Sequence, residues 1–344
     1  MNFGLPYKGS KNRIAKKILD VLPAAPVLYD VFCGGCAITH AALLSGKYSR
    51  VVANDINSMI PHAFETALAG GFRNEDRWIS RDDFQRLYKT DPYVAICFSF
   101  GNNLRRYCYA RELEPYKRAL HYAIFWKDTG PWWELCPETA DALKTAVESE
   151  QDRHKRRIGA GRAIVTALKA GLMNGTINPE VMNKPIYRKI RGNTALPPLQ
   201  STWALERLQR LERFERLKSL ETLENDKRLQ RLKSLERLER ITDVDAPPVL
   251  TVTTGDYRAL NFERGGIIYC DPPYKSTEER YGQDFDFEAF YSWCLHQSNP
   301  VFISEYTMPE DRFVPVAAVT VIRKVNTKKS SICPEKIWRP RTQL

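Results

Sequence analysis

The segment Gly265–Ser276, GGIIYCDPPYKS, places side chains that could bind an amine directly after a short apolar run. Pro272 and Pro273 have no N–H to donate, so their carbonyl oxygens and the Asp271 carboxylate form a rim of acceptors with restricted φ angles. Such a rim suits an exocyclic amine, which offers two N–H donors. Tyr274 adds a flat face on which a purine or pyrimidine can stack. This order of residues predicts a pocket for the amino group of a nucleobase.

A second candidate site lies near the N-terminus, where a glycine turn follows an apolar strand pattern. In Asp30–Gly35, DVFCGG, the glycines let the backbone approach a ligand and direct helix N-terminal amides at a negative group such as a carboxylate. The turn is not a dinucleotide-binding GxGxxG motif. Asp55 ends the next strand pattern, VVANDIN, from which an acid can bind ribose hydroxyls, although capping a helix would also explain it. Together the two features favour an adenosine-containing ligand.

Both sites lie in stretches with an α/β pattern. Apolar spacing predicts helices at residues 12–22, 37–45 and 287–297, and strands at residues 27–32, 50–57, 249–256, 265–271 and 300–306. A strand, a glycine turn, a helix and a second strand ending in an acid make a βαβ unit, whose ligand should lie at the carboxyl ends of the strands. The tail from Arg323 onward is basic and is interpreted as solvated surface.

From about Gly71 to Arg191 the pattern changes to helices rich in basic and aromatic residues. Basic side chains can neutralise phosphates, while aromatic faces can stack on exposed bases. A solvated helical face beside an ordinary core explains the same residues equally well. The candidate DNA-binding residues are Arg105, Arg106, Arg156, Arg157 and Arg162, interleaved with Tyr107, Tyr109, Tyr116 and Tyr122.

Residues 201–245 form a low-complexity repeat, in which Leu or Phe stands at every third position from Leu205 to Leu223, and Leu or Ile in the same phase from Leu229 to Ile241. On an α-helix of about 3.6 residues per turn, such a period drifts around the axis and makes neither a stripe nor a coiled-coil seam. We interpret the repeat as a helical arm within an insertion. An oligomerisation element is the alternative.

Composition narrows the class of protein. The chain has 344 residues, 43% of them hydrophobic, and no apolar run long enough to cross a membrane or to act as an N-terminal signal. A net charge of +11 fits a partner made of phosphates. The scattered cysteines predict reduced thiols, and Cys33 with Cys36 lacks the further ligands that a zinc site needs, so no metal is expected. The expected location is the cytoplasm.

The motifs and their order resemble those of a known family. PYKGSK (residues 6–11), DVFCGG, NDIN, a long variable region and then DPPY follow the order of the Dam-like, α-group N6-adenine DNA methyltransferases, which use S-adenosylmethionine. The resemblance implies a Rossmann-like methyltransferase fold of α/β class with a mainly helical target-recognition insertion. The catalytic domain would comprise residues 1–70 and 246–344, and the target-recognition domain residues 71–200.

The resemblance also implies roles for individual residues. The catalytic residues would be Asp271, Pro272, Pro273 and Tyr274, which hold the target amine. The donor-binding residues would be Tyr7, Lys11, Asp30, Phe32, Gly34, Gly35, Asp55 for the ribose, and Asp256 for the adenine ring of the donor. The family often has a further glycine where Cys36 stands.

The implied reaction is methyl transfer to adenine N6 in double-stranded DNA, with the target base flipped out of the helix at a cost of a few kcal/mol. Two alternatives stay open at this point. One is another amino-methyltransferase, acting on cytosine N4, RNA or a protein glutamine, although cytosine N4 enzymes more often have Ser in place of Asp271. The other is a non-catalytic scaffold that binds nucleic acid and uses the Leu-rich segment as its working part.

Overall fold

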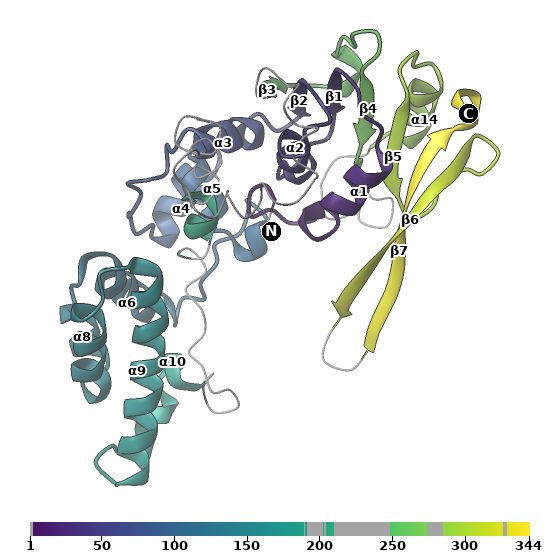
Figure 1. The fold of residues 1–344 in the computed structure, drawn as a ribbon. Coiled ribbons are helices and arrows are strands. Elements are labelled where there is room, and N and C mark those ends of the chain that lie inside the picture. Colours follow the sequence, from purple (N-terminus) through teal and green to yellow (C-terminus); the bar gives the residue numbers. More distant parts are fainter. Residues whose placement is uncertain are drawn as a thin grey trace, which may run out of the picture. The chain divides into compact units, whose positions relative to one another are not determined.

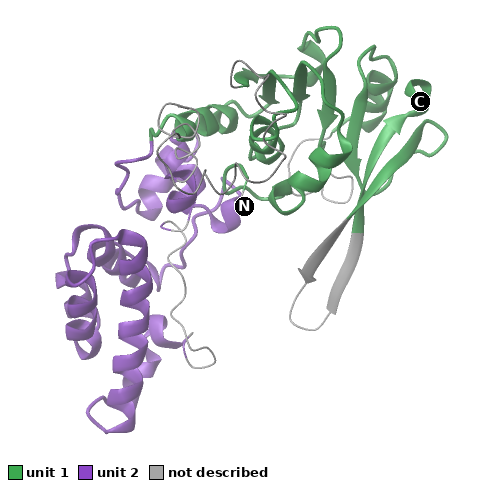
Figure 2. Ribbon diagram, in the orientation of Figure 1, with its two compact units in different colours: residues 1–71, 210–344 green, residues 72–209 purple. Residues whose placement is uncertain are grey.

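The computed structural model describes residues 3–188, 190, 202, 204–209, 248–273, 285–325 and 329–344, with the backbone alone for residues 320–325 and 329–333. The chain forms two compact units, shown in Figure 2. The first combines residues 1–71 with 210–344, and the second comprises residues 72–209. None of the described helices is long and apolar enough to cross a membrane.

Within the described part of the first unit, seven strands form one sheet in the order β3-β2-β1-β4-β5-β7-β6 (Figure 1). Neighbouring strands from β3 to β5 are parallel, whereas β7 runs antiparallel to both β5 and β6. This sheet and its helices confirm the predicted Rossmann-like α/β fold of a methyltransferase. The elements are α1 (Ala15–Val21), β1 (Val27–Asp30), α2 (Ala37–Leu43), β2 (Arg50–Asp55), α3 (Met59–Leu68), β3 (Val249–Thr254), β4 (Ile267–Cys270), α14 (Phe287–Leu295), β5 (Val301–Glu305), β6 (Phe313–Val325) and β7 (Lys329–Pro340).

Side chains alternate between the two faces of the sheet along each strand. Both faces of the central strands carry buried residues, and helices pack on both. In β1, Val27 and Tyr29 belong to the core cluster that contains Phe290 and Cys294 of α14. Asp30 points to the opposite face, where its carboxylate accepts hydrogen bonds from Thr39 of α2. Strands buried on both faces read as continuous apolar runs, which is why the sequence predicts them well.

The C-terminal tail is the part of this unit that the sequence analysis assigned wrongly. Where it is described, the tail forms the end of β6 and the strand β7, and Ile337 and Trp338 of β7 are fully buried rather than solvated. The indole N–H of Trp338 donates to the carbonyl oxygen of Glu305 in β5. The many Lys and Arg residues of the tail led to the prediction of an exposed segment. Its few apolar residues are nevertheless buried, because the strand packs on the rest of the sheet.

The second unit is helical, apart from an isolated bridge between Ser99 and Tyr107 among its described residues. Its helices are α4 (Arg81–Leu87), α5 (Pro92–Cys97), α6 (Glu114–Trp126), α7 (Gly130–Leu135), α8 (Ala140–Glu148), α9 (Arg153–Met173) and α10 (Pro185–Arg188). Asp152 begins α9 as an N-cap, since its side chain accepts a hydrogen bond from the Lys155 amide.

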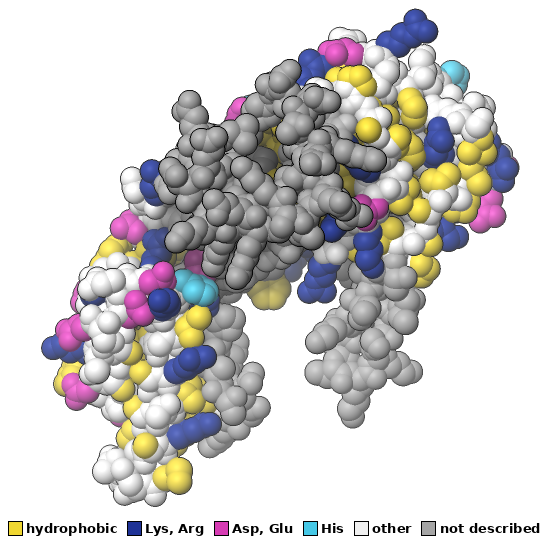
Figure 3. All heavy atoms as spheres, in the orientation of Figure 1, with side chains coloured by type: hydrophobic (Ala, Val, Ile, Leu, Met, Phe, Trp, Pro, Cys, Tyr) yellow, Lys and Arg dark blue, Asp and Glu magenta, His cyan; other side chains and the backbone are white. Residues whose placement is uncertain are grey.

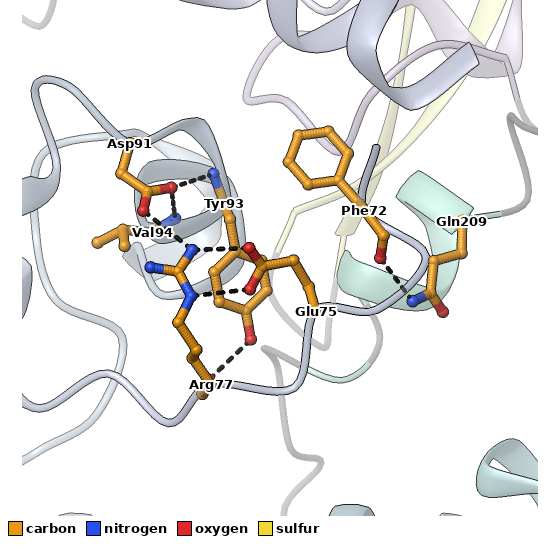
Figure 4. A network of polar contacts seen from close by, with 7 residues as sticks. All are labelled: Phe72, Glu75, Arg77, Asp91, Tyr93, Val94 and Gln209. Carbon is orange, nitrogen blue, oxygen red and sulfur yellow. Dashed lines mark hydrogen bonds and ion pairs between the residues drawn. The ribbon is translucent and has the colours of Figure 1, made fainter. Parts of the chain in front are cut away.

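The two ends of the second unit are joined by a direct hydrogen bond (Figure 4). The side-chain amide of Gln209 donates to the carbonyl oxygen of Phe72 at 2.8 Å. Beside it, the Arg77 guanidinium pairs with the carboxylates of Glu75 and Asp91. The hydrogen bond between Gln209 and Phe72 therefore holds the first and last residues of the second unit together.

Only the start of the Leu-rich segment is described, and there the predicted helix is present over residues 204–209. Leu205 and Leu208 are buried, and Glu206 pairs with Arg157. At these positions the repeat packs against the second unit as an ordinary helix. The rest of the repeat, residues 210–245, lies outside the described residues, so its predicted role stays a prediction.

Candidate active site

Apart from Tyr7 and Lys11, the described catalytic and donor-binding residues that were predicted lie at or directly after the carboxyl ends of parallel strands. The glycine turn follows β1, Asp55 ends β2, Asp256 follows β3 and Asp271 follows β4. Because parallel strands end at one edge of the sheet, four segments from distant parts of the sequence meet there. Tyr274 lies outside the described residues.

Asp271 forms an ion pair with Lys11 from the N-terminal motif. The Lys11 ammonium nitrogen lies 2.5 Å from Oδ1 and 2.6 Å from Oδ2 of Asp271. The Lys11 side chain is 6% exposed and that of Asp271 is 18% exposed. Pro272 is buried and Pro273 is partly buried. The pair therefore lies in a mostly dry environment where both charges interact strongly.

Two further carboxyl groups, from the neighbouring strands β5 and β7, complete this cluster. Glu335 of β7 lies 3.3 Å from the Lys11 ammonium nitrogen and also accepts a hydrogen bond from the Ser304 hydroxyl. Glu305, at the end of β5, accepts from the Tyr306 amide through Oε1, while its Oε2 is buried with no partner among the described residues. The cluster thus holds one ammonium and three carboxyl groups.

Burial and mutual repulsion set the protonation of these groups. Burial raises the pKa of Asp271 to about 6, although Lys11 acts in the opposite direction. Burial and then Asp271 raise the pKa of Glu305 to about 8, so this carboxyl is mostly protonated at neutral pH. Burial alone would lower the pKa of Lys11, but Asp271 and Glu335 outweigh it and raise that pKa.

Tyr7 packs directly on the glycine turn. A Cβ atom built on Gly35 would lie 2.5 Å from Cβ of Tyr7, and one built on Gly34 would lie 3.3 Å from the Tyr7 ring. Gly34 has a φ of +45°, and Cys36, the N-cap of α2, has a φ of +55°. Cys36 thus adopts a left-handed conformation, in which glycine is favoured because a residue with a side chain costs about 1–2 kcal/mol.

The two acids that flank this turn differ in their surroundings. Asp55 accepts hydrogen bonds from the amides of Gly34 and Asn57 at 2.9 Å each and keeps further acceptor capacity. Asp30 is fully buried, and burial raises its pKa to about 7. Its Oδ2 caps Thr39, whereas its Oδ1 is without a partner among the described residues.

Phe32 and Asp256 have other partners in this structure. The Phe32 ring packs on Tyr257 and Phe290, with ring centroids 5.0 and 5.7 Å away. Asp256 is bound by the guanidinium of Arg258, at 2.9 and 2.5 Å, in an exposed position. Their predicted contacts with a methyl donor stay predictions.

The candidate DNA-binding arginines fall into two groups. Arg105, Arg106 and Arg162 are exposed on the second unit, where Figure 3 shows Lys and Arg side chains scattered among apolar ones. Arg156 is buried, and its guanidinium donates to the carbonyl oxygens of Ile124, Glu150 and Gln151. Each of the three guanidinium nitrogens thus donates to a backbone carbonyl inside the unit, an arrangement that does not favour the predicted phosphate contact by Arg156.

Other residues of the basic and aromatic stretches are also structural. Arg157 is mostly buried and pairs with Glu206. Tyr107 and Tyr109 are buried, and Tyr109 stacks on Trp78, so neither ring presents a free face to a base. For these residues the alternative of an ordinary core holds, and spacing alone could not separate it from a stacking role.

Sequence reasoning missed Glu305, Glu335 and Ser304. The strand PVFISEY offered a signal for Glu305 and Ser304, since polar residues at the carboxyl end of a parallel strand are candidates for a site. No comparable signal existed for Glu335, which reaches the site only because β7 folds back beside β5.

One comparison with known proteins finds a similarity in the N-terminal part of the chain. Residues 7–87 match the family model of the D12 class N6 adenine-specific DNA methyltransferases. A comparison with curated proteins gives no match. The matched range includes Tyr7, Lys11, the glycine turn and Asp55, whose geometry is described above. In agreement with the predicted resemblance to Dam-like enzymes, this N-terminal part of the chain is similar to the D12 class N6 adenine-specific DNA methyltransferases.

Proposed function

We propose that the protein transfers the methyl group of S-adenosylmethionine to the exocyclic nitrogen N6 of adenine in duplex DNA, after the target base has been flipped out of the helix. The observation that carries the proposal is the position of Asp271. It follows the central strand β4 and precedes Pro272, while its carboxylate is held by Lys11 from the N-terminal motif. A nucleobase amine and a charged methyl donor could both be bound at such a point.

The chemistry of the surrounding groups fits S-adenosylmethionine, the donor that the family implies. The Lys11 ammonium suits its carboxylate, and the buried Oδ1 of Asp30 is an acceptor that suits an ammonium group. Asp55 suits the ribose hydroxyls, as acids at the end of the second strand do. Gly34 is only partly buried and has no side chain, so a ligand can approach its backbone, whereas Gly35 is buried against Tyr7.

The proposed role of Asp271 and Pro272 is to orient the target amine. S-adenosylmethionine, when bound, supplies a methyl group on a positively charged sulfur. The adenine nitrogen is a poor nucleophile because its lone pair is delocalised into the ring. Hydrogen bonds from its two N–H groups to the Asp271 carboxylate and the Pro272 carbonyl would localise that lone pair, and the carboxylate would stabilise the positive charge that develops on nitrogen.

Binding of the amine requires that Lys11 leave part of Asp271 accessible. Each carboxylate oxygen has two lone-pair sites, so an oxygen that accepts from Lys11 can accept a second hydrogen bond. Tyr274 would stack on the flipped base and offset part of the cost of unstacking. The exposed residues Arg105, Arg106 and Arg162 would contact the DNA backbone.

A direct test is to incubate adenine-containing duplex DNA with donor labelled in its methyl group and to identify the modified base after digestion. We expect the label on N6 of adenine. Label on cytosine would overturn the adenine assignment, and a preference for RNA would overturn the substrate. The matched control is a duplex in which adenine is confined to one strand, which should be labelled only on that strand.

A further inference from the structure

The C-terminal strand β7 contributes a buried acid to the site. Glu335 is 3% exposed, and a carboxylate this deeply buried requires partners. It has an ammonium, Lys11 at 3.3 Å, and a hydroxyl, Ser304. Ser304 lies on β5, which is the direct neighbour of β7 in the sheet. Glu335 is therefore held by two strands of the sheet, whereas Lys11 lies on the short turn of residues Lys11–Arg13.

The proposed reaction makes different demands on the two carboxylates that hold Lys11. Asp271 must accept from the target amine, and its interaction with Lys11 weakens as it does so. When Asp271 shares its oxygens with the amine, the buried Lys11 ammonium depends more on its second counter-ion, Glu335. Glu335 has no proposed role in binding the target amine. Its carboxylate can therefore stay on Lys11 while it also accepts a hydrogen bond from the Ser304 hydroxyl of β5.

We propose that Glu335 is a positioning residue of the methyltransferase site: it holds the Lys11 ammonium in place for the carboxylate of the methyl donor while Asp271 turns to the target amine. The proposal rests on the proposed function, and it assigns the C-terminal hairpin to the donor site. It also explains why two carboxylates surround one ammonium. One is the permanent counter-ion and the other is exchangeable.

The groups that face Lys11 come from three strands, namely Asp271 after β4, Glu305 on β5 and Glu335 on β7. Asp271 and Glu335 both raise the pKa of Lys11. Removing the charge of Glu335 would lower that pKa, because the remaining opposing charge competes less well with burial. Lys11 would then lose its proton at a lower pH, and donor binding would fail earlier on the alkaline side.

The test compares two ligands by calorimetry in the full-length chain. S-adenosylhomocysteine has the amino-acid end that Lys11 would bind, whereas 5′-methylthioadenosine has the same nucleoside without it. We expect Glu335→Gln to weaken binding of S-adenosylhomocysteine about tenfold and to leave methylthioadenosine within about twofold. The alkaline limit of S-adenosylhomocysteine binding should also move to lower pH. The control is Glu288→Gln. Glu288 is an exposed residue of α14 that pairs with Arg312, and its replacement should change the affinity for neither ligand.

Equal binding of S-adenosylhomocysteine by Glu335→Gln and the unmodified protein would overturn the proposal, and so would a parallel loss of both ligands. Should the Gln variant not fold, Ser304→Ala tests the same link, because it leaves the charge of Glu335 but frees its position. The expected result is a selective loss of about threefold for S-adenosylhomocysteine, and unchanged binding would contradict the proposal. An unmodified protein that binds neither ligand and methylates no DNA would instead refute the proposed function.

Discussion

The ammonium nitrogen of Lys11 lies 2.5 Å from the carboxylate of Asp271, although the two residues are 260 positions apart in the chain. Lys11 belongs to the PYKGSK motif and Asp271 to the DPPY motif, which lie in the two separate chain segments of the first unit. The second unit is inserted between them without interrupting the sheet. A pair of opposite charges thus joins the site that would bind the donor to the site that would bind the target amine.

Replacing Asp271 by Asn should lower kcat about 10²- to 10³-fold, because the amide has one acceptor oxygen and no charge to stabilise positive nitrogen. The substitution keeps the shape of the side chain, so the fold should persist, and Lys11 keeps Glu335 as a partner. The measurement is methyl transfer to DNA under single-turnover conditions. Asp311→Asn, at an exposed position, is the control and should retain full activity. A retained rate in the Asp271 variant would exclude the proposed orientation of the amine.

The pH dependence of kcat should show an acidic limb set by Asp271. Burial raises the pKa of this carboxyl to about 6, and the reaction requires the ionised form. As the pH falls through about 6 the carboxyl becomes protonated, and its O–H group then faces the N–H donors of the amine. We expect kcat to fall about tenfold for each further pH unit. A profile flat down to about pH 5, with the protein folded by circular dichroism, would contradict this assignment.

The fold of the catalytic unit could be predicted from the sequence because its central strands are buried on both faces. Ile267 and Ile268, for example, are apolar on both sides of β4, and the change to Asp271 marks the edge of the sheet. The hairpin of β6 and β7 could not be predicted in the same way. Its pairing depends on contacts with β5, such as that between Trp338 and Glu305, which no local pattern reveals.

A site residue could be predicted from the sequence only where it lies at the end of a recognisable strand or within a recognisable motif. Asp55 and Asp271 end strands, so their location at the sheet edge follows from the strands themselves. Glu335 enters the site through tertiary packing, and Arg156 leaves the predicted DNA-binding set for the same reason. An arginine on a basic helix gives no sign in sequence of which side faces the core, because Arg can bury its aliphatic part and still use its guanidinium.

Replacing Gly35 by Ala should loosen the N-terminal segment. The new Cβ would lie 2.5 Å from Cβ of Tyr7 and 3.3 Å from the carbonyl oxygen of Leu5, whose amide donates to the Gly35 carbonyl. We expect a lower melting temperature and about tenfold weaker binding of S-adenosylhomocysteine. Gly159→Ala in α9 is the control, because its Cβ meets nothing within 4 Å and should stabilise the helix by about 0.5–1 kcal/mol. Binding unaffected in the Gly35 variant would show that the turn is not part of the donor site.

Arg156 and Arg162 offer a matched pair on helix α9 that separates folding from DNA binding. Arg156→Ala leaves three backbone carbonyls, of Ile124, Glu150 and Gln151, without their donor, and it should destabilise the protein by at least about 2 kcal/mol. Arg162 is exposed, so Arg162→Ala should change stability by less than about 0.5 kcal/mol.

Fluorescence anisotropy with duplex DNA at several salt concentrations then compares the DNA binding of the two variants. If Arg162 neutralises a phosphate, its loss should reduce the slope of log K against log salt by about 1, whereas folded Arg156→Ala should keep the slope of the unmodified protein. The opposite pattern, a reduced slope with unchanged stability in Arg156→Ala, would restore Arg156 to the DNA-binding set.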